Sequence, residues 1–355
     1  MDVRDFDFDL PPELIAQEPP ATRGGARLLH LDRASGSIAH TNVSALPELL
    51  RAGDLVVVNN TRVFPARLLG RRVPSGGAVE CLLVGARHRD QTPVPGTAFW
   101  EALVYPGQKL KPGARVVFEG TATIHGEILE RRPFGRRVVR LWTEDGSSLD
   151  AAVDAIGHMP LPPYIKRDDR DDDRDRYQTL FAQYRGSIAA PTAGLHFSAP
   201  LITALRARGV EIAELTLHVG YGTFQPIRVD RVEDHRLESE RYEISPAAAA
   251  AIARARSDGR RVIAVGTTTT RTLEAVARLH NGVIVAGPGE TDLFLYPGAA
   301  FQVVTGLLTN FHLPQSSLLM LVSAFAGRDR VRSAYDAAIA KRYRFYSYGD
   351  AMLVL

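Results

Sequence analysis

The chain has 355 residues, of which 45% are hydrophobic, so it is long enough for two domains or for one core with a large insertion. No stretch approaches the roughly 20 consecutive apolar residues of a membrane helix, and the N-terminus MDVRDFDFDL is acidic, which argues against membrane insertion and export. Cys81 is the single cysteine; this excludes an intramolecular disulfide and a thiolate zinc site and predicts a cytoplasmic protein.

The net charge of +3 is unevenly distributed along the chain. Residues 61–150 contain 14 Lys and Arg against 9 Asp and Glu, whereas the remainder contains 29 against 31. The excess favours an anionic partner for this segment, and a solvated basic surface is the alternative. Only 4 of the 43 basic residues are Lys. Genomic base composition produces such a bias, but the planar guanidinium of Arg also suits phosphate recognition.

Short β-rich runs separated by glycine and proline fill residues 55–150, from DLVVVNN to RRVVRLW. No stretch of this segment repeats apolar residues at helical spacing over the length of a helix. The segment therefore predicts a small closed or nearly closed antiparallel barrel. The segment 167–176, RDDRDDDRDR, has no apolar residue and predicts a solvated loop without function.

Helices and strands alternate after residue 185. Ser198 caps a helix that has Pro200 in its first turn and ends at Gly209, and Ser245 opens an alanine-rich helix. The other expected elements are strands 210–220, 261–266, 303–314 and 350–355 and helices 267–282, 315–327 and 331–342. We therefore predict an α/β core domain, residues 1–60 and 156–355, with an inserted small antiparallel β-barrel domain, residues 61–155.

Polar clusters fall where the expected strands end, which is where α/β sheets bind ligands. In GSIAAPTAGLHF (186–197), Thr192 and Gly194 belong to a run of small residues that lets a ligand approach the backbone next to His196. A tight turn with a capping histidine is the alternative.

A second cluster is LTLHVGYGTFQP (215–226). His218 shares a strand face with polar residues and precedes a turn containing Gly220 and Gly222, so it is suited to accept a proton near neutral pH. The pattern alone slightly favours the alternative, a histidine bonded to a loop carbonyl.

The remaining clusters are VGTTTTRTLE, GETDLFLYPG and LTNFHLP. Arg271 lies in the first turn of a helix after four threonines, an arrangement that holds a carboxylate or phosphate or, alternatively, only caps the helix. Glu290, Asn310 and His312 stand among apolar residues and are either ligand contacts or structural hydrogen-bonding groups. No phosphate-loop, dinucleotide-binding or zinc-protease motif is present in the sequence.

Together these strings resemble one family, the S-adenosylmethionine:tRNA ribosyltransferase-isomerases of queuosine biosynthesis. The resemblance follows the family's order over nearly the whole chain. It rests on DFDLPPELIAQEP, VVNNTRVFPARLLG, LPPYIKR, RYQTLFA, AAPTAGLHF, HVGYGTFQP, VGTTTTRTLE, GETDLFLYPG, LTNFHLPQSSLLMLVSAFAG and YRFYSYGDAML.

The resemblance implies that an α/β core carries a β-barrel and that S-adenosylmethionine serves as co-substrate without a metal. Its ribosyl part is transferred to 7-aminomethyl-7-deazaguanine at the wobble position of a tRNA with a GUN-type anticodon. Adenine and methionine leave, and the product is epoxyqueuosine. We also expect no membrane partner and a monomer or weak homodimer.

Two stretches depart from the family's usual pattern. This chain has Asn60 where the family reads Asp in Asn-Asp-Thr-Arg. In HRLESE it keeps His235 and Glu240 but has Leu237 and Glu238 at the middle positions of the family's His-x-Met-His-Ser-Glu. These departures suggest one alternative, a tRNA-binding member that has lost catalysis. A further alternative is an S-adenosylmethionine enzyme with a small-molecule acceptor, in which the basic charge of the barrel is incidental.

The family mechanism is usually drawn with loss of a ribose proton next to the sulfonium, which requires a general base. Our hypothesis assigns that role to His196 or His218. The expected S-adenosylmethionine contacts are Thr192, Gly194, Gly220, Tyr221, Gly222, Phe224, Thr268, Thr269, Arg271 and Glu290, with the two aromatic rings facing the sulfonium. The expected contacts to the base and tRNA are Asn59, Arg62, Lys166, Asn310, His312, Tyr348 and Asp350.

Overall fold

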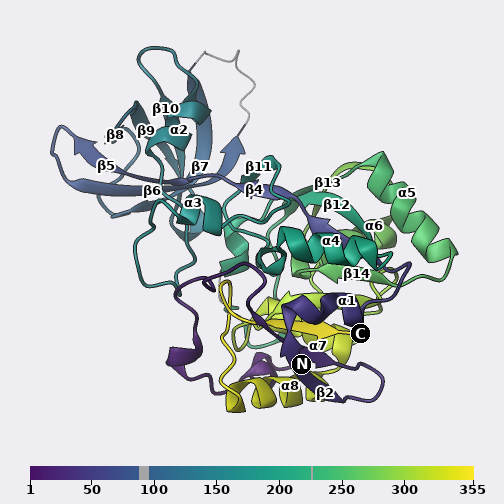
Figure 1. Cartoon of the computed structure of the whole chain (residues 1–355). Coiled ribbons are helices and arrows are strands. Elements are labelled where there is room, and N and C mark those ends of the chain that lie inside the picture. The colour runs from purple at the N-terminus through teal and green to yellow at the C-terminus, as the bar shows by residue number, and fades with distance from the viewer. Residues whose placement is uncertain (88–95, 225–226) are drawn as a thin grey trace. The chain divides into compact units, whose positions relative to one another are not determined.

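The computed structural model describes residues 1–87, 96–224 and 227–355, without the side chains of Arg87, Thr223 and Phe224. The chain forms two compact units (Figure 1). The first consists of residues 1–62, 163–167 and 178–355, and the second of residues 63–162 and 168–177. The predicted fold class, an α/β core with an inserted antiparallel barrel, is confirmed.

The first unit is built on a nine-stranded mixed sheet within the described residues. Four neighbouring strands at its centre run parallel. In spatial order the strands are β15 (Gly287–Thr291), β13 (Glu240–Ile244), β12 (Glu211–Leu217), β3 (Leu55–Asn59), β14 (Val262–Val265), β16 (Gly306–Asn310), β17 (Ala351–Val354), β1 (Arg27–Leu31) and β2 (Ile38–Asn42).

The central strands are buried along their whole length because both faces of the sheet are covered. Every residue of β3, β14, β16 and β17 is buried, which explains why LVVVN, VIAV and AMLV are nearly continuous apolar runs. One face packs against α5 (Pro246–Ser257), α6 (Thr267–Leu279), α7 (Ser317–Ala326) and α8 (Arg328–Ala340).

The other face of the sheet packs against α4 (Ala199–Ala207), α1 (Leu46–Leu49) and the short helix η5 (Thr192–His196). Helices α1 and α4 lie side by side (Figure 1). Serine caps start three of the predicted helices, because the hydroxyls of Ser198, Ser245 and Ser316 accept the N–H groups three residues ahead. Smaller 3-10 helices are η1 (Val3–Phe6), η2 (Pro12–Leu14), η3 (Val43–Ala45), η6 (Tyr221–Phe224) and η7 (Val232–Asp234).

The second unit is a closed antiparallel barrel of six strands in its described part. Buried and less buried residues alternate along β9, as expected of a strand with one face toward the barrel interior. Around the barrel the order is β10 (Arg136–Trp142), β7 (Thr97–Tyr105), β6 (Ala78–Arg87), β5 (Arg67–Val73), β8 (Arg115–Glu119) and β9 (Thr123–Arg131). Two short helices, α2 (Leu149–Ile156) and α3 (Asp173–Arg176), belong to the same unit.

Three details differ from the sequence-based expectations. The run DLVVVNN forms β3 of the core sheet, not a barrel strand, because it is buried on both faces. Residues 156–162 and 168–177 group with the barrel, whereas our division ended it at 155. The interpretation of 167–176 as a fully solvated loop is wrong: Asp173 is 1% exposed and accepts from the N–H of Arg170, and Asp169 accepts from His158.

In the sequence, β4 (Thr61–Val63) follows β3 and precedes the first barrel strand. It pairs with β11 (Tyr184–Ser187) in a short two-stranded sheet. The backbone N–H groups of Gln183 and Tyr184 donate to the carbonyl of Asn60, which ties this sheet to the end of β3.

Candidate functional site

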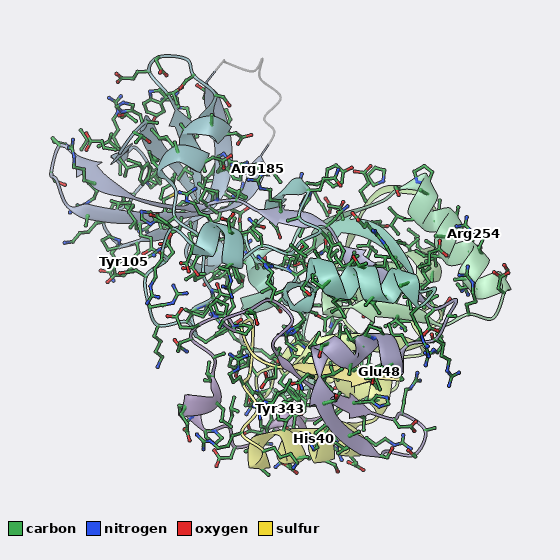
Figure 2. All side chains as sticks on the ribbon, in the orientation of Figure 1. His40, Glu48, Tyr105, Arg185, Arg254 and Tyr343 are labelled. Carbon is green, nitrogen blue, oxygen red and sulfur yellow. The ribbon has the colours of Figure 1, made fainter. Side chains whose placement is uncertain are left out.

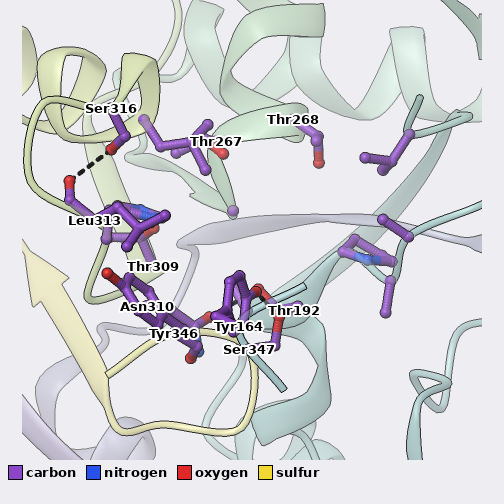
Figure 3. A pocket seen from close by; sticks show the side chains of 18 of the residues that line it. Tyr164, Thr192, Thr267, Thr268, Thr309, Asn310, Leu313, Ser316, Tyr346 and Ser347 are labelled. Carbon is purple, nitrogen blue, oxygen red and sulfur yellow. Dashed lines mark hydrogen bonds between the residues drawn. The ribbon is translucent and has the colours of Figure 1, made fainter. Parts of the chain in front are cut away.

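A cavity of about 320 Å³ lies at the carboxyl ends of the parallel strands in the first unit (Figure 3). Gly266 directly follows β14, Thr309 and Asn310 end β16, and Val219 lies two residues beyond β12. Because these strands run in the same direction, their carboxyl ends meet at one edge, which is where open α/β sheets bind ligands.

The side chains that line the cavity are uncharged within the described residues. Small or apolar residues such as Ala189, Pro191 and Leu318 form much of the wall. Neutral donors and acceptors come from Tyr164, Thr192, Thr267, Thr268, Thr309, Asn310, His312, Ser316, Tyr346 and Ser347. An apolar wall with a few neutral polar groups suits a heterocycle or a sugar, whereas an isolated charge buried there would be costly.

Helix α6 begins at this cavity, where Gly266, Thr267 and Thr268 all line it. Gly266 has φ 88° and ψ 158°, a conformation that is essentially restricted to glycine. No side chain of the described residues caps the helix, so the N–H groups of its first turn are available to a ligand. We predicted that Thr269 contacts S-adenosylmethionine, but its hydroxyl donates a hydrogen bond to the carbonyl of Val265.

The short helix η5 contributes one wall of the cavity through Thr192 and Ala193. Thr192 Oγ1 donates to Asn310 Oδ1 over 3.3 Å, which joins η5 to the end of β16. Gly194 lies behind this wall, and a Cβ there would come within 2.8 Å of the Thr179 methyl group. Close packing, not ligand approach, therefore accounts for the glycine at position 194.

His196 ends η5 and is 4% exposed, and it is not among the lining residues. Burial lowers the pKa of His196 to about 4, a shift that the positive charge of Arg344 reinforces and that Asp350 and the hydrogen bond with Asn310 oppose. The imidazole is thus neutral at pH 7. The side chain of Asn310, which lines the cavity, lies next to it.

His218 also lies outside the lining, next to Val219. Its Nδ1 is 2.8 Å from Thr61 Oγ1, and its backbone N–H donates to the carbonyl of Arg241. Burial lowers the pKa of His218, and the nearby Arg241 lowers it further. The ring is therefore neutral at pH 7, half-buried and fixed in orientation.

The Gly220 turn is connected to α6 through a buried ion pair. The Gly220 N–H donates to Glu240 Oε1 over 2.9 Å, and Oε2 of Glu240 pairs with the Arg271 guanidinium. Arg271 is 4% exposed, so its charge is committed to Glu240 inside the protein. Tyr221 and Gly222 lie in η6 outside the cavity lining, and the side chain of Phe224 lies outside the described residues.

The end of β16 supplies two predicted residues that do line the cavity. Asn310 Nδ2 donates to the Tyr346 carbonyl over 2.9 Å, and His312 Nε2 is 2.8 Å from Thr309 Oγ1. Burial lowers the pKa of His312 to about 3, so this imidazole is uncharged at neutral pH. Both side chains present neutral hydrogen-bonding groups to a ligand.

Sequence reasoning missed two tyrosines in the cavity wall, Tyr164 and Tyr346 (Figure 3). Their ring centroids are 4.6 Å apart, and the Tyr164 hydroxyl lies 2.5 Å from Ser347 Oγ. Tyr346 has φ 71°, an uncommon conformation for an aromatic residue. Backbone hydrogen bonds to Phe311 and Gly349 hold it there. LPPYIKR and YRFYSYGDAML both carried the family resemblance, but no periodicity pointed to these two side chains.

Two other predicted residues are structural hydrogen-bonding groups. Asn59 exchanges hydrogen bonds with both backbone groups of Leu217 and so joins β3 to β12. Its Nδ2 also reaches Thr268 Oγ1 at 3.4 Å. Asp350 is 1% exposed and accepts hydrogen bonds from Arg27 and Arg344.

The last predicted residues lie apart from the cavity lining. Tyr348 is buried at 2% exposure, whereas Arg62, Lys166 and Glu290 are exposed. The Ser239 hydroxyl donates to Glu290 at the edge of the sheet. Of the predicted set, the structure therefore brings Thr192, Thr268, Asn310 and His312 together around one cavity.

Asn60 is one of the two departures from the family pattern, and both ends of its side-chain amide have hydrogen-bond partners. Its Oδ1 accepts from Thr216 Oγ1 over 2.7 Å, and its Nδ2 donates to Glu214 Oε2 over 3.1 Å. An aspartate at this position has no N–H for Glu214 and would place two carboxylates side by side.

In the described parts of the chain, no group of three or more His, Cys, Asp or Glu side chains is arranged to hold a metal ion. Among the helices that the structure describes, none has the length and apolar character to cross a membrane.

Comparisons with known proteins agree with the resemblance in the sequence. A family profile described as "Queuosine biosynthesis protein" matches residues 3–354. The S-adenosylmethionine:tRNA ribosyltransferase-isomerase of Heliobacterium modesticaldum is 51% identical over 355 residues, and that of Desulfitobacterium hafniense is 50% identical, with 100% of both chains covered in each case. A crystal structure of S-adenosylmethionine tRNA ribosyltransferase from Thermotoga maritima is 37% identical, with a TM-score of 0.55, 99% of this chain and 100% of that chain covered.

The fold and the cavity define a two-unit protein whose α/β core has a cavity of small-molecule size at the carboxyl edge of its sheet. With the full-length match, the chain belongs to the family of queuosine biosynthesis proteins. The predicted family is thus confirmed, and the comparisons support the transferase-isomerase interpretation over the two alternatives.

Proposed function

We propose that this chain is an S-adenosylmethionine:tRNA ribosyltransferase-isomerase. It transfers the ribosyl part of S-adenosylmethionine to 7-aminomethyl-7-deazaguanine at the tRNA wobble position and rearranges it to the epoxycyclopentanediol of epoxyqueuosine. Adenine and methionine are the co-products. The observation that carries this proposal is the 51% identity to an enzyme of that name over the complete length of both chains.

The cavity at the carboxyl edge of the sheet is the proposed binding site for S-adenosylmethionine. Its neutral hydroxyl and amide groups, including Thr268 and Asn310, suit the ribose and adenine. The uncapped N–H groups at the start of α6 suit the methionine carboxylate, because a helix N-terminus favours a negative charge. Arg271 then acts by holding Glu240 and the Gly220 turn.

We assign the role of general base to His218. It is neutral at pH 7, half-buried and held through Nδ1 by Thr61, so its other nitrogen is free of that bond and able to accept a proton. His196 is a positioning residue in this proposal, since it is buried outside the cavity lining and lies next to Asn310.

The proposed tRNA carries a GUN-type anticodon with the aminomethyl-deazaguanine base. That base leaves its stack to reach the cofactor, as in other enzymes that modify nucleobases. Exposed Arg62 and Lys166 are proposed phosphate contacts. A cytoplasmic location and a monomer or weak homodimer complete the proposal.

Release of radiolabelled adenine tests this function. We expect release only when S-adenosylmethionine is incubated with tRNA that carries the aminomethyl base, and no release with unmodified tRNA. Release with the free base but without tRNA would favour a small-molecule acceptor, and tRNA binding without release would favour a member that has lost catalysis. His218→Ala is expected to abolish release with tRNA affinity unchanged, whereas wild-type release by this variant would refute the assigned base.

A further inference from the structure

The turn between β9 and β10 contains a residue that the fold alone does not explain. Phe134, in the stretch RRPFGRR (131–137), is 76% exposed and has φ 58°. A left-handed backbone favours glycine or asparagine, and a solvent-exposed turn favours a polar side chain. Phenylalanine is unfavourable on both counts, so a role outside folding is expected of it.

The strand register brings a second exposed aromatic residue to the same end of the barrel. The β10–β7 register ends with Arg136 opposite Leu103; Phe134 lies in the turn two residues before Arg136, and Tyr105 ends β7 two residues after Leu103. Tyr105 is 73% exposed (Figure 2). Large exposed side chains with aromatic faces thus gather where β7 ends and β10 begins.

Basic residues lie in the same loops and strand ends as these two aromatic residues. We define the aromatic end of the barrel as Tyr105, Lys109, Lys111, Arg115, Arg131, Arg132 and Phe134, all of them exposed. Lys109 and Lys111 lie in the loop after β7, and Arg115 and Arg131 lie at the near ends of β8 and β9. Glu130 forms an ion pair with Arg132 over 3.0 Å, which leaves the end with an excess of positive charge.

A buried arginine holds the two loops of the aromatic end in place. Arg137 is 6% exposed, and its guanidinium donates to the carbonyls of Gly107 and Leu110 in one loop and of Gly135 in the other. The exposed rings are therefore presented by a fixed scaffold, which reduces the entropy lost when a partner binds.

We propose that the aromatic end of the barrel binds RNA. Bases that are not paired stack on Phe134 and Tyr105, and the lysines and arginines contact phosphates. Aromatic faces beside basic side chains are the combination with which proteins bind single-stranded nucleic acid, and the positive charge complements the RNA backbone. The identity of the RNA as the tRNA substrate rests on the proposed function.

Fluorescence anisotropy with the unmodified tRNA transcript tests this inference without any turnover. The double variant Phe134→Ala, Tyr105→Ala is expected to bind at least about tenfold more weakly, with an unchanged salt dependence. The triple variant Lys109→Ala, Lys111→Ala, Arg131→Ala is expected to lower the slope of log Kd against log salt by about 2. Leu279→Ala is the matched control, because Leu279 is 71% exposed on the other unit.

Folding is checked with Phe134→Gly, which relieves the left-handed backbone and is expected to leave the melting temperature unchanged or raised. If the double variant binds the transcript within twofold of wild type, or if Leu279→Ala loses as much affinity, the inference is overturned. A wild-type protein that binds tRNA through these residues but releases no adenine would instead contradict only the proposed function.

Discussion

Replacement of Gly266 by Ala tests whether the backbone at the start of α6 shapes the cavity. Gly266 has φ 88° and ψ 158°, and a Cβ placed there would lie 3.6 Å from the Cβ of Ala193 and 3.9 Å from Thr268 Oγ1. Both are ordinary contact distances, so the methyl group has room and the cost is conformational. We expect a loss of about 1–3 kcal/mol in the free energy of unfolding, measured by urea denaturation of the full-length protein.

The same substitution should weaken S-adenosylmethionine binding, because relief of the strain shifts the first turn of α6, where Thr267 and Thr268 line the cavity. Isothermal titration calorimetry measures this affinity. The matched control is Gly259→Ala: Gly259 has φ 66°, a methyl group there would have nothing within 4 Å, and the residue lies before β14, at the opposite end of that strand from Gly266. It should lose roughly 1 kcal/mol and retain full affinity. A Gly266→Ala protein with wild-type stability and affinity would refute this reasoning.

Three further predictions concern polar side chains with defined hydrogen-bond partners or burial. Burial lowers the pKa values of His196 and His312 to about 4 and about 3, so the unfolded chain binds more protons than the folded chain below pH 6.5. Stability should therefore fall as the pH drops from 6.5 to 4, and His196→Gln should reduce the total loss over this interval, measured by urea titrations, by about 3 kcal/mol. Asn60→Asp should destabilise the protein by about 1–2 kcal/mol in chemical denaturation, and a second change, Glu214→Gln, should restore most of the loss. Ser316→Ala removes the cap of α7 and should cost about 1 kcal/mol in the same assay, whereas an unchanged value would contradict the cap.

Local sequence signals were sufficient for much of the fold. Caps at Ser198 and Ser245 marked the starts of two helices, because these side chains accept hydrogen bonds from residues only three positions ahead. The same kind of cap at Ser316 was not recognised from the sequence. The alternation of small apolar strands with turns marked the barrel. DLVVVNN was grouped with the barrel strands although the predicted domain boundary left it in the core, since a short apolar run does not reveal which neighbours will bury it.

The site was harder to predict because its walls come from distant parts of the chain. Thr192, Thr268, Asn310 and His312 fall at strand ends, a position that sequence patterns identify, and they line the cavity. Tyr346 lies in an irregular segment, and only the tertiary structure shows that its ring packs against Tyr164. Likewise, nothing in the sequence reveals that Glu240 lies within reach of Arg271, 31 positions away.

The central claim is that this chain builds the epoxycyclopentanediol on a tRNA base. Its most direct test is mass spectrometry of the nucleosides from tRNA carrying 7-aminomethyl-7-deazaguanine after incubation with purified protein and S-adenosylmethionine. We expect conversion of the wobble nucleoside to epoxyqueuosine in the wild-type reaction and none without S-adenosylmethionine. An unchanged wobble nucleoside, with protein that is folded and binds both substrates, would contradict the claim.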